Sequence, residues 1–242
     1  MLGAGPAGLT AALYAARGKL KTLVVTGPMV GGQIALTNHV DNYPGFPDGV
    51  SGPELSDRFK AHAERFGAEF LDAEATKIDL ASRPIRVWVG EKLLEAKALI
   101  VATGMTHKRL GVPGEDRLLG RGVFVCATCD AILYEDKKVV VVGGGDSAVR
   151  LRNLKTGEVS VEDADGVLLA IGWDPNTSIL RGQLDLDELG YIKSDGIDSG
   201  KPGVFLAGDL IDRKYRQVAT SCGSGCAAAL EAITWLEGRP AE

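Results

Sequence analysis

The sequence lacks several features that would assign it to large classes of protein. No apolar run approaches the roughly 20 residues that span a membrane, and no signal peptide is recognisable. Cysteine is scarce, with 4 in 242 residues, which is too few for a disulfide scaffold and favours the cytoplasm. Basic residues are not in excess either: the net charge is −5, whereas binding of nucleic acid needs a basic face. We therefore expect a cytoplasmic protein that binds neither a membrane nor nucleic acid.

Glycine, by contrast, is abundant, and one group of glycines has a regular spacing. The chain contains 32 glycines, and Gly3, Gly5 and Gly8 form the pattern GxGxxG. Residues 7–17 are predicted to form a helix after it, and residues 22–25 a strand. In such a βαβ start the first glycine makes a tight turn, the second lets backbone approach a diphosphate, and the third packs helix on strand. The sequence therefore predicts a dinucleotide site at this turn.

This first turn departs from the usual pattern in two ways. The acidic residue that holds a ribose at the end of the second strand is replaced by Thr26, whose hydroxyl would take that role. Only Met1 and Leu2 precede the turn, although the fold needs a central strand there, because its neighbours would otherwise expose unpaired backbone. We therefore expect residues before Met1 to be missing from this sequence.

A second turn of the same kind lies in the middle of the chain. Gly143, Gly145 and Ala148 form GxGxxA directly after an apolar strand at residues 138–142, and alanine is permitted at the third position. Two such starts predict two nucleotide-binding domains. A helix of about three turns should follow, yet residues 151–159 have the pattern of strand, turn and strand. We therefore expect residues near 148–150 to be missing too, because the middle domain is otherwise too short.

Two cysteines with the spacing CxxC, Cys126 and Cys129, lie just before this second turn and are followed by Asp130. A zinc site would need two more ligands, but there is no second CxxC and the 3 histidines are scattered, so no metal site is predicted. A structural disulfide does not fit a reducing cytoplasm. A redox-active dithiol at a helix start fits better, since the helix dipole and free amides stabilise a thiolate. Asp130 could exchange protons with it, whereas Cys222 and Cys226 are interpreted as small core residues.

Two further strand ends are candidate ligand positions. The apolar run 98–102 stops at Thr103 and Gly104, and open α/β sheets bind ligands at such edges. The run 203–208 ends at Asp209, which could bind a ribityl hydroxyl or, alternatively, cap a helix. The loops at residues 31–33 and 42–46 could be turns alone. A strand at residues 167–172, a turn at 174–176 and a helix within 215–236 complete the prediction.

Together these motifs resemble the thioredoxin reductases of the low-molecular-weight bacterial and archaeal type. The resemblance covers nearly the whole sequence and rests on the first glycine turn and on GGQ at 31–33, DNYPG at 41–45, ATG at 102–104, CATCD at 126–130, GGGDSA at 143–148, GVFLAGD at 203–209 and YRQVATSCGSGC at 215–226. It implies an α/β fold with two Rossmann-like domains. An FAD-binding domain in two halves, residues 1–108 and 167–242, would enclose an NADPH-binding domain, residues 109–166, that carries the CxxC. It also implies a homodimer with a domain rotation.

The resemblance further implies roles for individual residues. Cys129 would lie next to the flavin, and Cys126 would attack the disulfide of thioredoxin. FAD would be bound by Gly3, Gly5, Pro6, Ala7, Gly8, Thr26, Gly32, Gln33, Asn42, Thr103, Gly104, Asp209, Arg216, Gln217 and Val218. NADPH would be bound by Gly143, Gly145, Asp146, Ser147 and Ala148. The basic cluster that holds the 2′-phosphate of NADPH in this family is absent, so the preference for NADPH rests on the resemblance alone.

Three hypotheses about function follow. The leading one is an NADPH-dependent enzyme that passes electrons through FAD and the Cys126–Cys129 pair to thioredoxin or a thioredoxin-like protein. The second keeps the flavin and the dithiol but replaces NADPH by ferredoxin or reduced flavin, which takes the short middle domain at face value. The third is a non-catalytic interaction protein, and the intact cysteine pair with its neighbouring acid argues against it.

Overall fold

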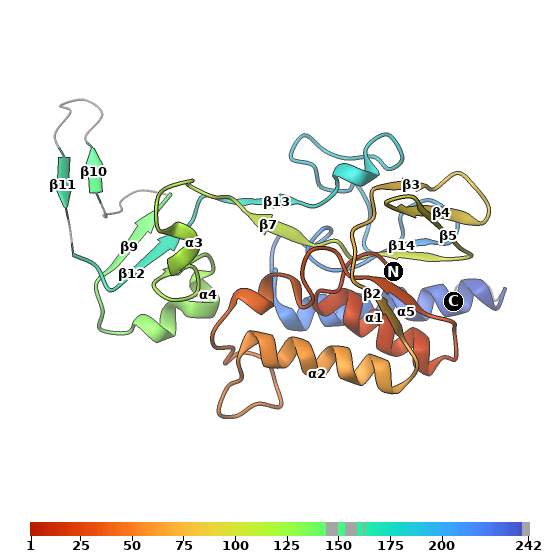
Figure 1. The fold of residues 1–242 in the computed structure, drawn as a ribbon, viewed down its shortest axis with the longest axis horizontal. Coiled ribbons are helices and arrows are strands. Elements are labelled where there is room, and N and C mark those ends of the chain that lie inside the picture. Colours follow the sequence, from red (N-terminus) through yellow and green to blue (C-terminus); the bar gives the residue numbers. More distant parts are fainter. Residues whose placement is uncertain (144–149, 153–158, 162, 239–242) are drawn as a thin grey trace. The chain divides into compact units, whose positions relative to one another are not determined.

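The computed structural model describes residues 1–143, 150–152, 159–161 and 163–238, which fall into two compact units (Figure 1). Unit 1 comprises residues 1–35, 52–106 and 175–242, and unit 2 comprises residues 36–51 and 107–174. Within the described part of the chain, no helix has the length and apolar character needed to cross a membrane.

Unit 1 is built on a parallel sheet. β1 (Leu23–Val25) pairs with β2 (Glu69–Leu71), and β6 (Leu99–Val101) pairs with β14 (Val204–Leu206). Leu2 lies between the two pairs and forms parallel bridges to Val25 and Val101. The first two residues therefore occupy the position of the central strand that the glycine turn requires, and they satisfy backbone groups on both neighbours.

Three helices cover one face of this sheet. They are α1 (Pro6–Arg17), α2 (Gly52–Arg65) and α5 (Val218–Leu236), and Figure 1 shows them running alongside one another, with α1 packed against both of the others. Side chains alternate between the two faces of a strand, so Ile100 and Phe205 contact alanines of α1 and α5 such as Ala11 and Ala228. The small side chains on these helices let the helix backbones approach the sheet closely.

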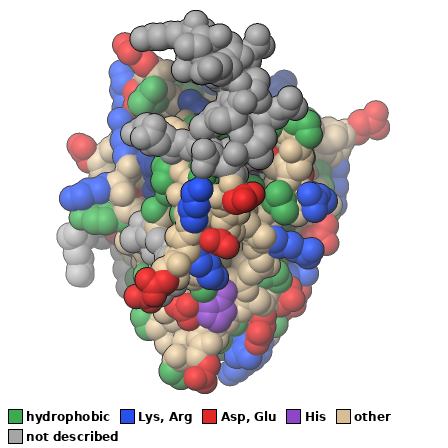
Figure 2. All heavy atoms as spheres, turned by 90° about the vertical axis from the view of Figure 1, so that its left-hand side faces the viewer, with side chains coloured by type: hydrophobic (Ala, Val, Ile, Leu, Met, Phe, Trp, Pro, Cys, Tyr) green, Lys and Arg blue, Asp and Glu red, His purple; other side chains and the backbone are tan. Residues whose placement is uncertain are grey.

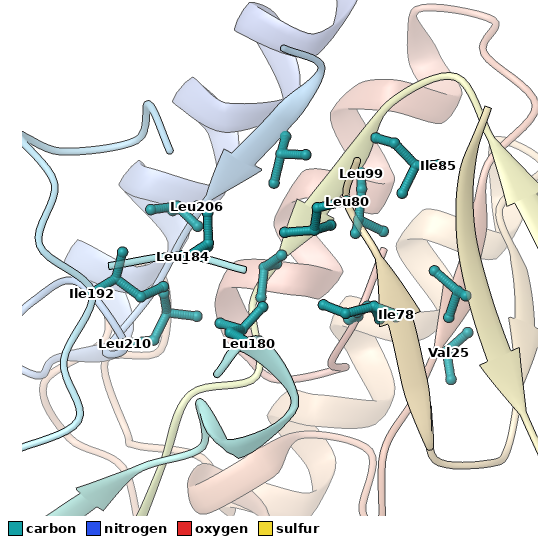
Figure 3. Packing of buried hydrophobic residues seen from close by; sticks show 14 residues of the cluster. Val25, Ile78, Leu80, Ile85, Leu99, Leu180, Leu184, Ile192, Leu206 and Leu210 are labelled. Carbon is teal, nitrogen blue, oxygen red and sulfur yellow. The ribbon is translucent and has the colours of Figure 1, made fainter. Parts of the chain in front are cut away.

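An antiparallel sheet covers the opposite face. It consists of β3 (Lys77–Asp79), β4 (Ile85–Val89) and β5 (Lys92–Ala96), and the 3₁₀ helix η3 (Ser178–Leu180) packs beside it. Figure 3 shows the core between the layers, where Leu80 and Ile85 lie near Leu99, and Leu180 lies near Leu210. Each such fully buried side chain contributes about 1.5–3 kcal/mol to stability. Packing against this layer therefore stabilises the parallel sheet.

Unit 2 contains a smaller parallel sheet in the order β8 (Val123–Phe124), β12 (Gly166–Leu169), β9 (Val139–Val142). It also contains α3 (Glu115–Leu118), α4 (Ala127–Asp130) and the 3₁₀ helix η2 (Ala131–Tyr134). β10 (Arg150–Arg152) and β11 (Val159–Val161) form an antiparallel pair, which confirms the strands expected around residues 151–159. On the face drawn in Figure 2, acidic and basic side chains are interspersed.

Two strands join the units, and here the boundaries differ from the expected ones. β7 (Met105–His107) pairs with β13 (Trp173–Pro175), so the turn expected at residues 174–176 begins as a strand. We expected residues 167–242 to return to the first domain, but β12 belongs to the sheet of unit 2, which extends to Asp174 and also takes in residues 36–51. An apolar run predicts a buried strand, yet it cannot indicate which parallel sheet receives that strand. The α/β fold class itself is confirmed.

Candidate functional site

The turn before α1 has the geometry of a diphosphate-binding turn. Gly3 has a φ of 102°, and a Cβ there would overlap the carbonyl oxygen of Ala102. A Cβ at Gly8 would overlap the carbonyl oxygen of Gly3, so α1 packs directly on the turn. At Gly5, which precedes the helix, a Cβ would meet no atom of the described residues within 4 Å, and none of their side chains caps the helix. The N-terminus of α1 is therefore open where an anionic group would bind.

Residues from two other segments surround this turn. Gly32 begins the 3₁₀ helix η1 (Gly32–Leu36), and a Cβ on it would lie 3.4 Å from the Cα of Gly5. A Cβ at Gly208, just after β14, would lie 2.9 Å from the Cβ of Ala7 in the first turn of α1. Pro6 occupies the start of the helix, where its missing N–H leaves no hydrogen bond unmade. The structure thus brings the predicted residues Gly32 and Pro6, and the glycine before the predicted Asp209, together at one helix end.

Thr26 lies directly after β1, at the place predicted for it. Its hydroxyl donates a hydrogen bond to the carbonyl oxygen of Gly27 at 2.9 Å, and its side chain is buried. The amide of Ala4 donates to the carbonyl of Thr26 at 3.1 Å, which ties the glycine turn to the strand. The hydroxyl hydrogen is therefore used inside the protein, and only the oxygen lone pairs remain for a ribose.

Thr103 and Gly104 are held by a residue that the sequence marked only as part of a turn. The side-chain amide of Asn176 donates to the backbone carbonyl of Thr103 at 2.9 Å. The backbone carbonyl of Asn176 accepts from the Thr103 hydroxyl at 2.8 Å. Its backbone amide donates to the carbonyl of Gly104 at 3.0 Å. The hydroxyl of Thr106 completes the group by donating to the Asn176 side chain at 2.9 Å. Asn176 thus fixes the shape of the loop after β6.

Asp209 follows β14 and lies close to the start of α1. The hydroxyl of Ser221 donates to its carboxylate at 2.8 Å, and burial raises the pKa of Asp209 while this hydrogen bond opposes the shift. The alternative role as a helix cap is not realised, because Gln217 is the capping residue of α5. The carboxylate therefore has one oxygen engaged by Ser221 and is suited to accept a hydrogen bond from a ligand hydroxyl.

The turn before α5 holds an arginine in an unusual conformation. Arg216 has a φ of 51°, and its amide donates to the carboxylate of Asp212 at 3.0 Å. The Nη2 of Arg216 donates to the hydroxyl of Tyr191 at 2.8 Å, but its Nε is buried and has no hydrogen-bond partner in the described part of the protein. Val218 begins the helix directly afterwards. A buried donor of this kind calls for an acceptor from a ligand.

The remaining predicted flavin residues are divided between the units. Gln33 lies in η1 of unit 1, together with the residues above, whereas Asn42 lies in unit 2. The sequence motif around Asn42 does not indicate this assignment, because its loop has no pattern that links it to either sheet.

In unit 2, Cys126 and Cys129 form a disulfide at the start of α4, with an S–S distance of 2.05 Å. The amide of Cys129 donates to the Sγ of Cys126 at 3.2 Å, and both residues are partly accessible to solvent. Burial raises the pKa of Asp130, although a backbone hydrogen bond with Cys126 opposes the shift. In the described residues, no cluster of three or more potential metal ligands is present. A disulfide can accept two electrons, and a carboxyl that can bind a proton lies next to this one in the chain.

The turn after β9 repeats the geometry of the first one. Gly143 has a φ of 92°, and a Cβ there would overlap the carbonyl oxygen of Ala170, which follows the neighbouring parallel strand β12. Gly3 and Ala102 have the same relationship in unit 1. The other residues predicted for this site, Gly145, Asp146, Ser147 and Ala148, lie outside the described residues.

The two units together define a class of protein. Unit 1 combines an open helix N-terminus, a buried carboxylate and a buried arginine Nε that has no partner among the described residues, which fit a dinucleotide with a polar ring system. Unit 2 combines a second glycine turn with a disulfide. Such a set is typical of an oxidoreductase that binds nucleotide cofactors and acts on disulfides.

Comparison with known proteins agrees with this class. The family described as pyridine nucleotide-disulphide oxidoreductase matches residues 1–151 and 149–225, and the chain belongs to this family. It is 39% identical to a thioredoxin reductase of Mycolicibacterium smegmatis over 296 aligned positions, which cover 98% of this chain and 95% of the relative. It is 37% identical to a bifunctional thioredoxin reductase/thioredoxin of Mycobacterium leprae, with 98% and 65% covered.

Solved structures give the same result. A thioredoxin reductase from Giardia duodenalis has a TM-score of 0.88 at 33% identity, covering 98% of this chain and 97% of that one. The resemblance to thioredoxin reductases that the motifs predict is therefore confirmed. The alignment with the Mycolicibacterium smegmatis relative contains 296 positions, more than the 242 residues of this chain.

Proposed function

We propose that this protein is an NADPH-dependent flavoenzyme that reduces the disulfide of thioredoxin or of a thioredoxin-like protein. The observation that carries the proposal is the Cys126–Cys129 disulfide beside Asp130, in a chain that also has the open dinucleotide turn of unit 1. The names of its relatives support the reaction type, because thioredoxin reductases are oxidoreductases that act on a protein disulfide.

FAD would be held mainly by residues of unit 1, together with Asn42 of unit 2. The turn of Gly3 to Gly8 and the N-terminus of α1 would bind the diphosphate, Asp209 would accept from a ribityl hydroxyl, and Arg216 to Val218 would lie at the ring. When bound, FAD supplies two-electron redox chemistry between a nicotinamide and a disulfide. The protein would contribute position and charge: the helix N-terminus would offset the diphosphate charge, and the buried Nε of Arg216 would donate to an acceptor on the ring.

The cysteines would pass the electrons on by thiol–disulfide exchange. Two electrons and two protons convert the Cys126–Cys129 disulfide to two thiols. The thiolate of Cys126 then attacks a disulfide sulfur of the partner, which releases one partner thiolate, and Cys129 displaces the second while the internal disulfide re-forms. Asp130, whose pKa is raised by burial, would donate a proton to a leaving thiolate and recover it afterwards.

NADPH would enter at the turn of Gly143, whose geometry matches that of Gly3. We further propose that the nicotinamide domain is shorter than in the relatives, because residues that the relatives have are missing near positions 148–150. Two findings support this: the 296-position alignment exceeds the length of the chain, and the family matches in two stretches that meet at residues 149–151. The comparisons give no support to a donor other than NADPH.

The partner and the assembly are also proposals. The Mycobacterium leprae relative, in which a reductase and a thioredoxin share one chain, supports thioredoxin as the partner of this enzyme. We propose a homodimer in the cytoplasm, on the ground of the resemblance to thioredoxin reductases.

Serine substitutions test the route through the dithiol. Because each cysteine is needed for the exchange, Cys126→Ser and Cys129→Ser should each lower thioredoxin-coupled NADPH oxidation at least about 100-fold, while the flavin spectrum persists. Cys226→Ser is the matched control, since Cys226 lies on α5 in unit 1, outside the disulfide, and it should retain activity. Full thioredoxin reduction by Cys129→Ser would show that electrons bypass the dithiol.

A further inference from the structure

Arg216 has a backbone conformation that its side chain disfavours. Its φ of 51° lies in the left-handed region, where residues other than glycine are rare and where the surrounding structure must hold them. Asp212 provides the hold on the backbone. Its carboxylate accepts hydrogen bonds from the amides of Lys214, Tyr215 and Arg216 at 2.9, 2.8 and 3.0 Å. The turn is thus built to present Arg216 in one orientation.

Tyr191 holds the guanidinium of Arg216. It is 5% exposed, and its hydroxyl accepts from the Nη2 of Arg216 at 2.8 Å while donating to the Sδ of Met105 at 3.6 Å. The guanidinium of Arg213 lies 4.8 Å from the centre of the Tyr191 ring and pairs with Asp187 at 2.8 Å. Arg213 therefore packs on the face of the Tyr191 ring, and the Tyr191 hydroxyl orients Arg216.

This arrangement leaves one strong donor unused. The Nε of Arg216 is buried without a hydrogen-bond partner among the described residues, directly before the N-terminus of α5. A buried donor on a charged group is costly when it is unpaired. Both the guanidinium and the helix N-terminus favour an acceptor that is negatively charged or becomes so.

We propose that Tyr191 is a positioning residue for the flavin, which fixes Arg216 so that its Nε donates to a carbonyl oxygen of the ring. The inference rests on the flavin site proposed above. Because the guanidinium stabilises the negative charge that the ring gains on reduction, loss of the Tyr191 hydroxyl weakens flavin binding and lowers the reduction potential. A role confined to stabilising the fold would leave the potential of the bound flavin unchanged.

The test is Tyr191→Phe, which removes only the hydroxyl and keeps the ring for Arg213. FAD affinity is measured by reconstitution of the flavin-free protein, and the midpoint potential by dye equilibration. We expect an affinity loss of about tenfold, the size of one hydrogen bond to a charged group, and a shift of the potential to more negative values. Tyr215→Phe is the matched control, because Tyr215 lies in the same turn but is 59% exposed, and it should change neither quantity.

A second variant guards against a folding defect in the first. Arg216→Lys keeps the charge but removes the Nε donor, so it should weaken FAD binding by a similar factor. Combined with Tyr191→Phe it should cause little further loss of FAD affinity, since both changes disrupt the same set of hydrogen bonds. Unchanged affinity and potential in Tyr191→Phe, with a flavin-containing wild-type protein, would overturn this inference and leave the proposed function standing. A wild-type protein that binds no FAD would overturn both.

Discussion

At the scale of single residues, two glycines have the same structural role in different units. Gly3 and Gly143 have φ values of 102° and 92°, and each faces the carbonyl of an alanine that directly follows the neighbouring parallel strand. A side chain at either position would clash with backbone, which cannot move without distorting the sheet. The requirement is therefore local, and for this reason the glycine spacing alone predicts both turns.

Asp212 offers a test at the same scale that depends on pH. Burial acts to raise its pKa, but the hydrogen bonds from Tyr215, Arg216, Lys214 and Thr220 outweigh it, so the pKa of Asp212 lies below its ordinary value of 3.8. The unfolded chain therefore binds the proton more readily, and the carboxylate stabilises the fold above pH 3.8 and loses this effect as pH falls through the native pKa. Asp212→Asn should lower the free energy of unfolding by about 1 kcal/mol at pH 7, after allowance for solvent screening.

Urea unfolding across pH checks this prediction. The difference in the free energy of unfolding between the wild-type protein and Asp212→Asn should narrow as the pH falls below 3.8, because the unfolded wild-type chain then takes up a proton and the native carboxyl follows only at lower pH. A difference that stays constant from pH 7 to pH 3 would mean that the charge of Asp212 has no part in holding the turn.

At the scale of elements, the packing of α5 on α1 depends on glycine at one point. A Cβ at Gly225 would overlap the carbonyl oxygen of Ala7, in the first turn of α1. A Cβ at Gly223, on the same helix, would meet no atom within 4 Å. The close approach of the two helices brings Asp209 and the turn before α5 near the N-terminus of α1, so this contact shapes the proposed flavin site.

Alanine at these two positions should have opposite effects on stability. Gly225→Ala should destabilise the protein by about 1–3 kcal/mol, because the helices must separate. Gly223→Ala should stabilise it by about 0.5–1 kcal/mol, since alanine favours the helix and nothing obstructs its methyl group. Thermal unfolding with flavin removed and restored measures both, and only Gly225→Ala should also weaken FAD binding. Equal effects of the two variants would contradict the packing argument.

At the scale of the whole molecule, the two units divide the proposed reaction. Unit 1 holds the residues proposed for FAD except Asn42, and unit 2 holds Asn42, the disulfide and the second glycine turn. Within the described part of unit 2, the segment between β9 and β12 contains the strands β10 and β11. The alignment with the relatives is longer than the chain. The nicotinamide site is proposed to begin in this same segment, at Gly143, so the electron donor is the part of the proposal that most needs a direct test.

An anaerobic titration provides that test. NADPH should bleach the flavin absorbance of the wild-type protein and of Cys129→Ser alike, because the flavin precedes the dithiol in the proposed sequence. Dithionite is the control, since it reduces a flavin without a nicotinamide site. Bleaching by dithionite but not by NADPH would contradict NADPH as the donor and leave the disulfide chemistry of unit 2 intact.

The accuracy of prediction from the sequence differed between local and long-range features. The helix predicted at residues 7–17 is found at Pro6–Arg17, because the pattern that predicts it lies within the segment. The strands β3 and β7 were missed, since three residues carry too little pattern. Asn176 and Tyr191 gave no distinctive signal, because their partners Thr103 and Arg216 lie 73 and 25 residues away.

The sequence by itself determined the chemistry of the protein: two glycine turns, a CxxC with its acid, and an acid at the end of a strand. Each depends on residues at fixed short spacing, so the backbone alone brings them together. Only the tertiary structure decided that β12 joins unit 2, that Gly32 and Gly208 each lie against the start of α1, and that Tyr191 orients Arg216. These contacts link distant segments, and they form only when the packed core fixes where each segment lies.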